Sequence, residues 1–390
     1  MSLSPIPPRW PRGCLIENVA PHPTQPWLAV ACTNAELEQG AVMIFDAQTG
    51  ALRSAAIHEG YVGWSDPGLL RWHPDGRRIA TNVDTNGIAL LDGTTWVGFA
   101  YPDDTRDGGV GYVWIDERMY TDTANLFEIQ PGDARFEFET LDAPALQGIE
   151  WNEQLGAVVG RVGTGVAAYD PLERIVVYQN DLAEYGARGT PRYSPDGRWC
   201  VRWQPAVHPA ADALLFIDGD TGEVHGTRQP TSPRVDELVW GPNGALAVRS
   251  YVHHIGGPRS DVRIDLFFAS ERRQTLDLGA RRVQASHDVP EASGMAWSPD
   301  ANGLALLLDG QEVRVHDARS GAVLSSFIAP APAIPDGLPD YYTNAHLPDF
   351  GRPGDLLWLE QHRLIRVAPH FVSVWTIDGQ KVAEFVVGSE

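Results

Sequence analysis

Residues 296–327 read AWSPDANGLALLLDGQEVRVHDARSGAVLSSF, and this stretch decides the fold. Four short runs rich in apolar residues cover 296–297, 304–308, 312–316 and 322–327, and the breaks between them contain Gly, Asp, Asn or Pro. Each of the longer runs has the length of an ordinary strand, and the residues of the breaks favour tight turns. The stretch therefore predicts four antiparallel strands joined in series, which form one small sheet.

Two features of this stretch recur along the 390-residue chain. The first is an aromatic residue that ends the first run, and it recurs at Trp72, Trp114, Trp151, Tyr193, Trp240, Trp297 and Trp358, with Pro21 in its place in a degenerate first copy. The second is a polar turn before the last run, and it recurs at 46–50, 92–95, 130–133, 170–173, 218–222, 269–272, 317–321 and 377–380. The two series alternate throughout, so the chain consists of eight similar units.

These units predict an all-β protein, because no segment shows helical amphipathic periodicity over three turns. Repeats of about 40 to 60 residues with four strands each are typical of a β-propeller, in which the sheets pack radially as blades. We predict eight four-stranded blades without strand exchange between the first and the last. The alternative is seven blades, with the irregular unit around Trp114 as the one that fails. We expect residues 1–13 to be an N-terminal extension and residues 14–390 to be one propeller domain, with a Pro-rich loop insertion at 329–354.

The turns in RWHPDG (71–76), RYSPDG (192–197) and AWSPDANG (296–303) resemble those of bacterial WD40-type propeller repeats. The resemblance extends over residues 14–388. No unit carries the Trp-Asp dipeptide at the end of its third strand, where pairs such as Phe45-Asp46 and His316-Asp317 stand instead. The Gly-His dipeptide of that family is also missing. The resemblance therefore implies the propeller architecture and does not imply the role of a particular subfamily.

Composition disfavours several classes of partner. The chain has 30 basic and 51 acidic residues and a formal net charge of −21, which is unsuited to nucleic acid or an anionic membrane. No run reaches the roughly 18 apolar residues of a membrane-spanning helix, and the N-terminus lacks the apolar segment of a signal peptide. Cys14, Cys32 and Cys200 are too few and too dispersed for a disulfide framework or a zinc motif. We expect a cytoplasmic protein with reduced, buried thiols.

Long insertions occur at two kinds of connection. One kind joins the second and third strands of a unit, as at 204–212 and 252–261, and the other joins successive units, as at 101–109, 279–293 and 329–354. Both kinds emerge on one face of a propeller, because the chain reverses direction at every turn. We call it the long-loop face. Binding residues usually lie on loops that a rigid scaffold positions, so we expect the recognition site there.

Nine residues in the longest connections are candidates for partner binding, namely Asp103, Asp104, Arg106, Asp107, His253, His254, Tyr341, Tyr342 and His346. The acidic group suits a basic partner surface, and tyrosines are frequent contact residues at interfaces. Adjacent histidines on an extended chain point to opposite sides, so the His253–His254 pair is a poor chelator without a third ligand. We therefore predict a protein partner, with no metal and no cofactor.

The sequence contains no GxSxG elbow, HExxH motif, P-loop or GxGxxG after a strand. The main hypothesis is a non-catalytic interaction scaffold that binds a partner protein through the long-loop face. One alternative is a hydrolase or lyase at the central channel, metal-assisted or not, which draws paired carboxylates from Asp103, Asp104, Asp107 and Glu150. Another is a small-molecule sensor with its ligand at the mouth of the channel. The sequence leaves the oligomeric state open.

Overall fold

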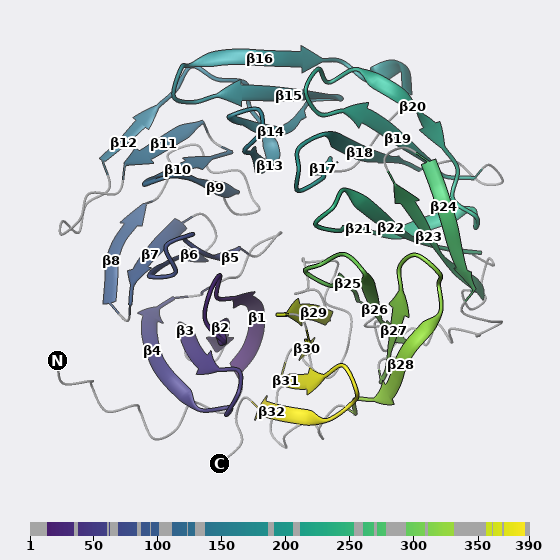
Figure 1. The fold of residues 1–390 in the computed structure, drawn as a ribbon. Coiled ribbons are helices and arrows are strands. Elements are labelled where there is room, and N and C mark those ends of the chain that lie inside the picture. The colour runs from purple at the N-terminus through teal and green to yellow at the C-terminus, as the bar shows by residue number, and fades with distance from the viewer. Residues whose placement is uncertain are drawn as a thin grey trace.

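The computed structural model of the chain describes residues 14–34, 38–60, 62, 69–83, 87–93, 95–100, 111–122, 124–128, 137–185, 191–205, 211–252, 260–268, 271–277, 294–308, 311–330, 356–360, 362–368 and 370–386. Their strands form eight four-stranded antiparallel sheets, each paired in sequence order. The sheets stand side by side around a central axis as the blades of a propeller (Figure 1). The first strand of each blade is innermost and the fourth is outermost.

The first four blades use the N-terminal half of the chain. Their strands are β1 (Cys14–Pro21), β2 (Trp27–Asn34), β3 (Gln39–Asp46), β4 (Leu52–Glu59), β5 (Leu70–Trp72), β6 (Arg78–Val83), β7 (Gly87–Asp92), β8 (Thr95–Ala100), β9 (Tyr112–Ile115), β10 (Arg118–Thr121), β11 (Asn125–Glu128), β12 (Glu137–Thr140), β13 (Gln147–Asn152), β14 (Ala157–Val162), β15 (Gly165–Asp170) and β16 (Ile175–Asn180). Among the described residues the only helix is the short 3-10 element η1 (Ala183–Tyr185), which follows β16.

The other four blades complete the ring. Their strands are β17 (Arg192–Tyr193), β18 (Trp199–Gln204), β19 (Ala213–Asp218), β20 (Val224–Arg228), β21 (Arg234–Trp240), β22 (Ala245–Val252), β23 (Ser260–Phe268), β24 (Glu271–Asp277), β25 (Met295–Trp297), β26 (Gly303–Leu308), β27 (Glu312–Asp317), β28 (Val323–Ile328), β29 (Leu356–Leu359), β30 (Arg363–Ala368), β31 (Phe371–Thr376) and β32 (Lys381–Val386). No helix in the described ranges is long and apolar enough to cross a membrane.

The eight-blade prediction is confirmed, and the seven-blade alternative is wrong. The unit around Trp114 forms a complete sheet from β9 to β12, although each of its strands has only four residues. Such short strands leave little room for an alternating pattern, which is why this unit looks irregular in the sequence.

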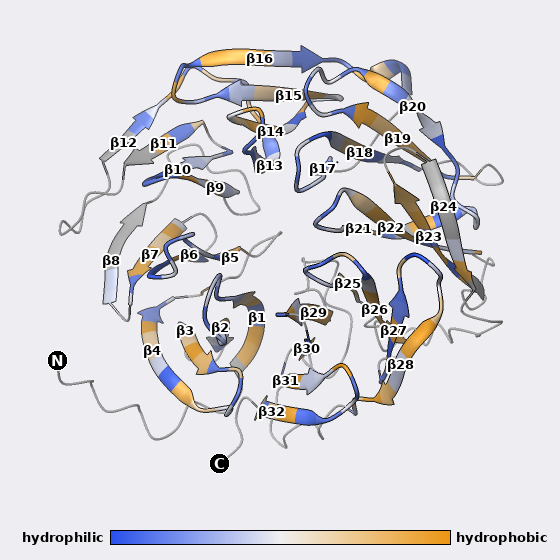
Figure 2. Ribbon diagram, in the orientation of Figure 1, coloured by the Kyte–Doolittle hydropathy of each residue, from blue (hydrophilic) through white to orange (hydrophobic). Residues whose placement is uncertain are grey.

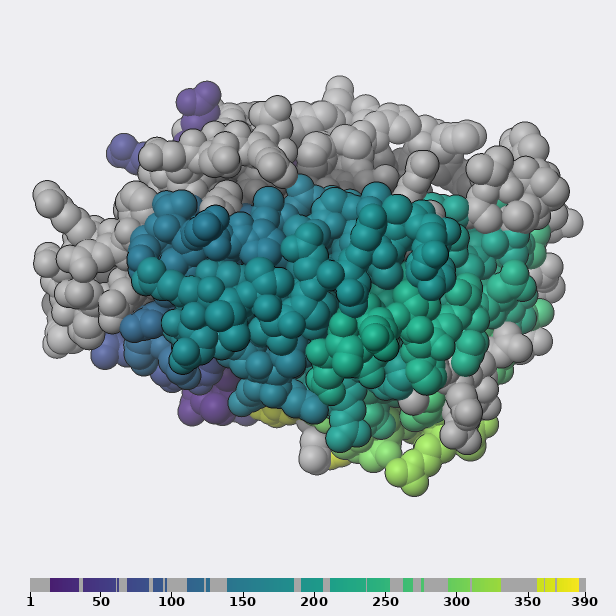
Figure 3. All heavy atoms as spheres, turned by 90° about the horizontal axis from the view of Figure 1, so that it is seen from above, coloured from purple at the N-terminus to yellow at the C-terminus, as the bar shows by residue number. Residues whose placement is uncertain are grey.

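Apolar side chains cover both faces of the blades. The buried residues group into eight clusters, and each cluster joins two neighbouring blades. The middle strands β7 and β19 are predominantly apolar, whereas the outer strands β4 and β32 mix apolar with polar residues (Figure 2). Figure 3 views the rim over blades 4 and 5, where the outer strands face solvent. A blade therefore acquires its core only from its two neighbours.

The ring closes without strand exchange, as predicted. All four strands of blade 1 come from the N-terminal segment, and all four of blade 8 come from the C-terminal segment. One cluster joins them, and in it the rings of Phe45 and Phe385 lie 4.3 Å apart between centroids. The seam between the chain ends is thus held by side-chain packing.

Three of the recurring tryptophans also link blades through their indole groups. Trp72 Nε1 donates to the carbonyl of Ala20 at 3.0 Å. The equivalent bonds of Trp240 and Trp297 reach the preceding innermost strands β17 and β21. At these three positions the aromatic anchor therefore both fills the space between blades and satisfies a carbonyl on the neighbouring strand.

Replacing Phe385 by Ala should cost about 3 kcal/mol of unfolding free energy, because it removes a buried aromatic from the closing cluster. The control is Ile328→Ala, which truncates an outer-strand side chain that is 58% exposed and should change stability by less than about 0.5 kcal/mol. Urea-induced unfolding followed by tryptophan fluorescence measures both values. Equal losses for the two variants would show that the seam contributes no more than an exposed position.

Candidate functional site

The nine predicted partner-binding residues lie outside the described residues. They fall within 101–110, 253–259 and 331–355, so their role stays a prediction. The described residues do include the strand ends from which the connections of the long-loop face start. These ends show how the face is organised.

Buried polar side chains fix the connection between the first two blades. Thr33 Oγ1 donates to the carbonyl of Val62 at 3.0 Å and accepts its N–H at 3.3 Å. Asn82 Oδ1 accepts the N–H of Leu69 at 3.0 Å. Thr33 and Asn82 are themselves buried, so an unmade bond would leave a desolvated polar group inside the protein. The chain is therefore held on both sides of residues 63–68.

The same arrangement recurs in the later blades. The Asp212 carboxylate accepts bonds from the Arg234 guanidinium and the backbone N–H of Val235, each at 2.9 Å. The Asp265 carboxylate binds both the N–H and the hydroxyl of Thr231 at 2.6 Å, and the buried Arg366 donates to the carbonyl of Ala329. Polar groups within the blades thus fix the strand ends from which the connections of the long-loop face begin.

The opposite face, which carries the turns after first and third strands, uses its polar groups differently. We call it the turn face. His22 Nδ1 accepts the backbone N–H groups of Thr24 and Gln25 at 3.0 and 2.9 Å. The ring proton therefore lies on Nε2, which donates to the carbonyl of Gly76 at 2.8 Å in the next blade.

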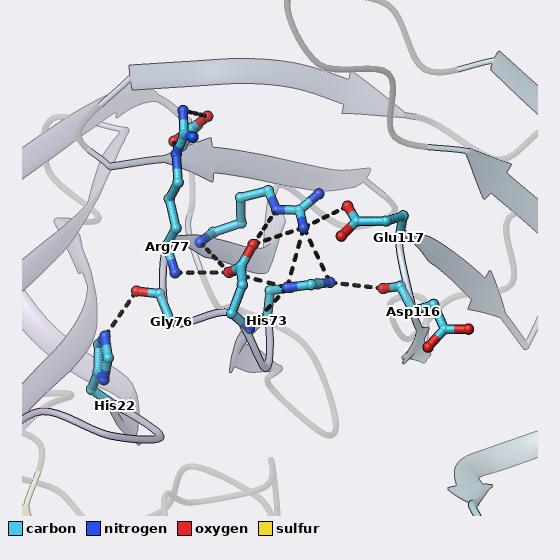
Figure 4. Close-up of polar contacts among 9 residues, drawn as sticks. His22, His73, Gly76, Arg77, Asp116 and Glu117 are labelled. Atoms are coloured by element: carbon cyan, nitrogen blue, oxygen red, sulfur yellow. Dashed lines mark hydrogen bonds and ion pairs between the residues drawn. The ribbon is translucent and has the colours of Figure 1, made fainter.

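His73 repeats this bond between blades 2 and 3 within a larger polar network (Figure 4). Its Nε2 lies 2.7 Å from the carbonyl of Asp116, and its Nδ1 accepts the N–H of Asp75 at 3.1 Å. The Arg78 guanidinium bridges Asp75 at 2.7 Å and Glu117 at 2.6 Å. Burial acts to raise the pKa of Asp75, but bonds from the Arg77 N–H and from Arg78 lower it to about 2.

A third bond of this kind joins blades 4 and 5, where Asn152 Nδ2 donates to the carbonyl of Gly197 at 3.1 Å. Blades 5 and 7 have serine at this position, and Ser194 and Ser298 bond to the Asp two residues later in their own turns. In the sequence these polar residues share one position of the repeat, directly after the aromatic anchor. That recurrence marks the position but predicts no function for it. These bonds make the turn face part of the scaffold.

The innermost strands bring together charged residues that are far apart in the sequence. Arg71, Glu150 and Arg192 each stand immediately before the aromatic anchor of their blade. Burial raises the pKa of Glu150, while the positive charges of Arg192 and Arg71 and a bond from the Tyr193 N–H oppose the rise. Of the carboxylates named for a channel enzyme, Glu150 is the one that the structure describes, and the charges shown to act on its pKa are those of Arg192 and Arg71.

Glu17 is the other notable carboxyl on an innermost strand. It occupies a β-bulge in β1, between Ile16 and Asn18, where the pairing with β2 shifts by one residue. The side chain is half-buried, and this burial raises its pKa to about 7. A carboxyl that titrates near neutrality can exchange a proton under physiological conditions. Periodicity could not identify it, because a bulge interrupts the alternation of a strand.

The described residues show no group of three or more His, Cys, Asp or Glu side chains that could hold a metal ion. Cys32 and Cys200 are both buried. Burial raises the pKa of the Cys200 thiol, which opposes formation of a reactive thiolate.

This geometry defines the class as an all-β, eight-bladed propeller. The sequence matches no family model and no curated protein. The fold is similar to that of the Dos1 propeller, with a TM-score of 0.62 and 13% identity over 95% of this chain and 96% of that one. It is similar to Saccharomyces cerevisiae Sqt1, with a TM-score of 0.58 and 11% identity over 94% and 96%. The computationally designed protein Ika8 gives 0.54 and 10% over 96% of each chain.

These similarities are of fold alone. They show a β-propeller fold like those of the Dos1 propeller and Sqt1. A shared fold gives neither the function nor the partner.

Replacing Gly76 by Ala should destabilise the protein more than replacing Gly93. Both glycines have positive φ, 69° and 63°, so each substitution carries a backbone cost of about 1 kcal/mol. A Cβ at Gly76 would also lie 2.5 Å from the His22 ring, whereas nothing lies within 4 Å at Gly93. We expect Gly76→Ala to lose about 2 kcal/mol more than Gly93→Ala in urea unfolding. Equal losses would mean that the His22 bond contributes nothing to the packing of the blades.

Replacing Glu17 by Gln should stabilise the protein increasingly as the pH rises above about 4.5. The folded-state pKa of about 7 exceeds the ordinary value of 4.5, so the folded protein holds the proton more tightly than the unfolded chain. Ionisation of Glu17 therefore destabilises the folded protein. This destabilisation is absent below about pH 4, grows as the pH rises between the two pKa values, and is complete above about pH 7. At about pH 8 the variant should gain up to about 3 kcal/mol of unfolding free energy.

The matched control for this measurement is Glu223→Gln, which changes an exposed carboxyl. Its unfolding free energy should differ little from that of the original protein at either pH. A gain for Glu17→Gln that is the same at about pH 4 and about pH 8 would contradict the ionisation argument.

Proposed function

We propose that this protein is a non-catalytic scaffold that binds a partner protein through its long-loop face. The observation that supports it best is the repeated fixing of the connections on that face by buried polar side chains. Thr33, Asn82, Asp212, Asp265 and Arg366 bind the backbone or side chains of these connections close to where they leave the blades. When the ends of a loop are already fixed, less conformational entropy is lost as the loop becomes ordered on binding a partner.

The turn face supports the same assignment by contrast. Its turns are short, and its recurring polar side chains are engaged in bonds within and between blades. The long-loop face has the opposite character, because its length varies from blade to blade while its strand ends stay fixed.

The nature of the partner follows from charge. The net charge of −21 favours a partner with a basic surface, which would be attracted over a distance and oriented during the encounter. Asp103, Asp104 and Asp107 are the proposed contacts for such a surface, and Tyr341 and Tyr342 are the proposed aromatic contacts. We place the interaction in the cytoplasm, on the sequence grounds given above.

A second candidate function is a channel-centred enzyme or small-molecule sensor. The observation that favours it is Glu17, an innermost-strand carboxyl whose pKa of about 7 suits proton exchange or the binding of a cationic ligand. It ranks second because the arginines near Glu150 oppose a paired-carboxylate mechanism there.

Removing residues 331–348 should reduce partner recovery about fivefold or more if this insertion contributes the tyrosine contacts. A second variant, with Asn at positions 103, 104 and 107, should weaken recovery and make it less sensitive to salt. Both are compared with the original chain by affinity purification from the native cell and quantitative mass spectrometry.

The control variant carries Ser at Gln48 and Arg319, which are exposed on the turn face, and it should recover the same partners as the original chain. Thermal unfolding confirms that each variant is folded. The proposal would be wrong if both loop variants recovered the same proteins as the original chain. It would also be wrong if the turn-face control no longer recovered them.

A further inference from the structure

The rim of blade 4 exposes an unusual run of apolar side chains. Leu172, Ile175, Val176 and Val177 are 44%, 55%, 48% and 38% exposed, and three of them are consecutive on the outer strand β16. Figure 2 shows β16 as apolar along its first half, and Figure 3 looks directly onto this part of the rim. We call these four residues the rim patch. Exposed apolar residues in such a group are more often a binding surface than a random feature.

The turn beside the rim patch departs from the pattern of blades 1, 5 and 7. In blades 1, 5 and 7 the turn before the outer strand ends in a glycine with positive φ, at Gly50, Gly222 and Gly321. Blade 4 has Arg174 at this position, with φ of 60°. This conformation is unfavourable for a residue with a Cβ, so blade 4 keeps a non-optimal residue there.

The Arg174 side chain connects the rim patch to blade 3. Its guanidinium lies 2.7 Å from the Glu139 carboxylate on the outer strand β12. Both side chains are more than half exposed, so the pair contributes little to stability. Because the ion pair adds little stability, stability does not explain why Arg174 occupies this turn. The exposed surface that the turn forms is the better explanation.

Carboxylates surround the rim patch on both sides. On the side of blade 3, burial raises the pKa of Tyr169 beneath β16, and the nearby charges that act on it are Arg174, Asp142, Asp170 and Glu139. On the side of blade 5, burial raises the pKa of Tyr178, with further contributions from Cys200, Asp218 and Asp220. Glu173 lies in the turn itself. The patch is thus apolar at its centre and mostly acidic around it, with Arg174 as the one cation that these contacts place there.

We propose that the rim patch of blade 4 is a second protein-binding surface, which receives a cationic amphipathic segment of a partner. The apolar side chains of that segment cover Leu172, Ile175, Val176 and Val177, and its Lys or Arg residues face the surrounding carboxylates. A second copy of this chain is disfavoured, because it would bring the same acidic border against itself. This surface is separate from the long-loop face, so it extends the scaffold function to the rim.

Blade 7 provides a matched control within the chain. Val323 and Leu324 on β28 occupy the register positions of Val176 and Val177, and the same bulge follows in the pairing with the third strand. They are 52% and 62% exposed, which is more than their counterparts in blade 4. The turn before β28 has Arg319 and Ser320 where blade 4 has Leu172 and Glu173. Blade 7 therefore has the apolar exposure and the Asp at the start of the turn, Asp317, but a cation and a serine in place of Leu172 and Glu173.

The test measures binding of a short fluorescein-labelled peptide that alternates lysine and valine, by fluorescence anisotropy on the full chain. Replacing Val176 and Val177 by Ser should weaken binding about tenfold, whereas replacing Val323 and Leu324 by Ser should change it less than about twofold. Raising NaCl from about 0.05 M to about 0.5 M should also weaken binding. A peptide that alternates glutamate and valine should not bind.

Three results would overturn the proposal. One is an equal loss of peptide affinity in the two double variants. It would mean that exposed apolar residues bind the peptide whatever charged residues surround them. Another is unchanged binding in the blade 4 variant, which would mean that the peptide binds elsewhere on an acidic protein. The third is a dimer, seen by light scattering, that only the blade 4 variant converts to a monomer, which would make a second copy the occupant. Thermal unfolding verifies that both variants are folded.

Discussion

Every blade of this protein has two apolar faces, and this constraint governs the rest of the structure. A four-stranded sheet of this size cannot remain in water with both faces exposed, so each blade must lie between two others. An open row would leave two uncovered faces at its ends. Packing of blade 8 against blade 1 removes both at once, and it does so through a cluster that includes Phe45 and Phe385. The closed ring is therefore a consequence of burial, and the loops and turns are free to serve other purposes.

The fold could be predicted because it is repeated. Aromatic anchors such as Trp297 and polar turns such as 317–321 each mark a fixed place in the blade, so eight imperfect copies support one another even where the unit around Trp114 is weak. The bond from His22 to Gly76 could not be predicted, because it depends on how two turns 54 residues apart meet in space. Glu17 was missed for a local reason, since its bulge interrupts the two-residue period. The proposed binding residues lie in the connections, where no repeat fixes their position.

Polar groups have different tasks in different parts of the disc. On the turn face, His22, His73 and Asn152 join neighbouring blades through backbone carbonyls. On the long-loop face, Thr33 and Asp265 hold the chain where it leaves the sheets. Because both sets are buried or half-buried and bonded, variation can occur in the connections without disturbing the ring. This division explains how a scaffold with short, constrained turns can present loops of very different length on a single side.

The absence of strand exchange at the seam has a consequence for how such a chain can change in size. In a ring whose last sheet borrows a strand from the other terminus, the first and last units depend on each other for backbone pairing. Here every unit owns its four strands, and in the described part of the chain side-chain packing joins blade 8 to blade 1. A duplication or loss of one whole unit would leave no strand unpaired, so the number of units is limited by the angle at which neighbouring sheets pack. Such a chain is modular in whole units, because each blade is complete in its backbone pairing.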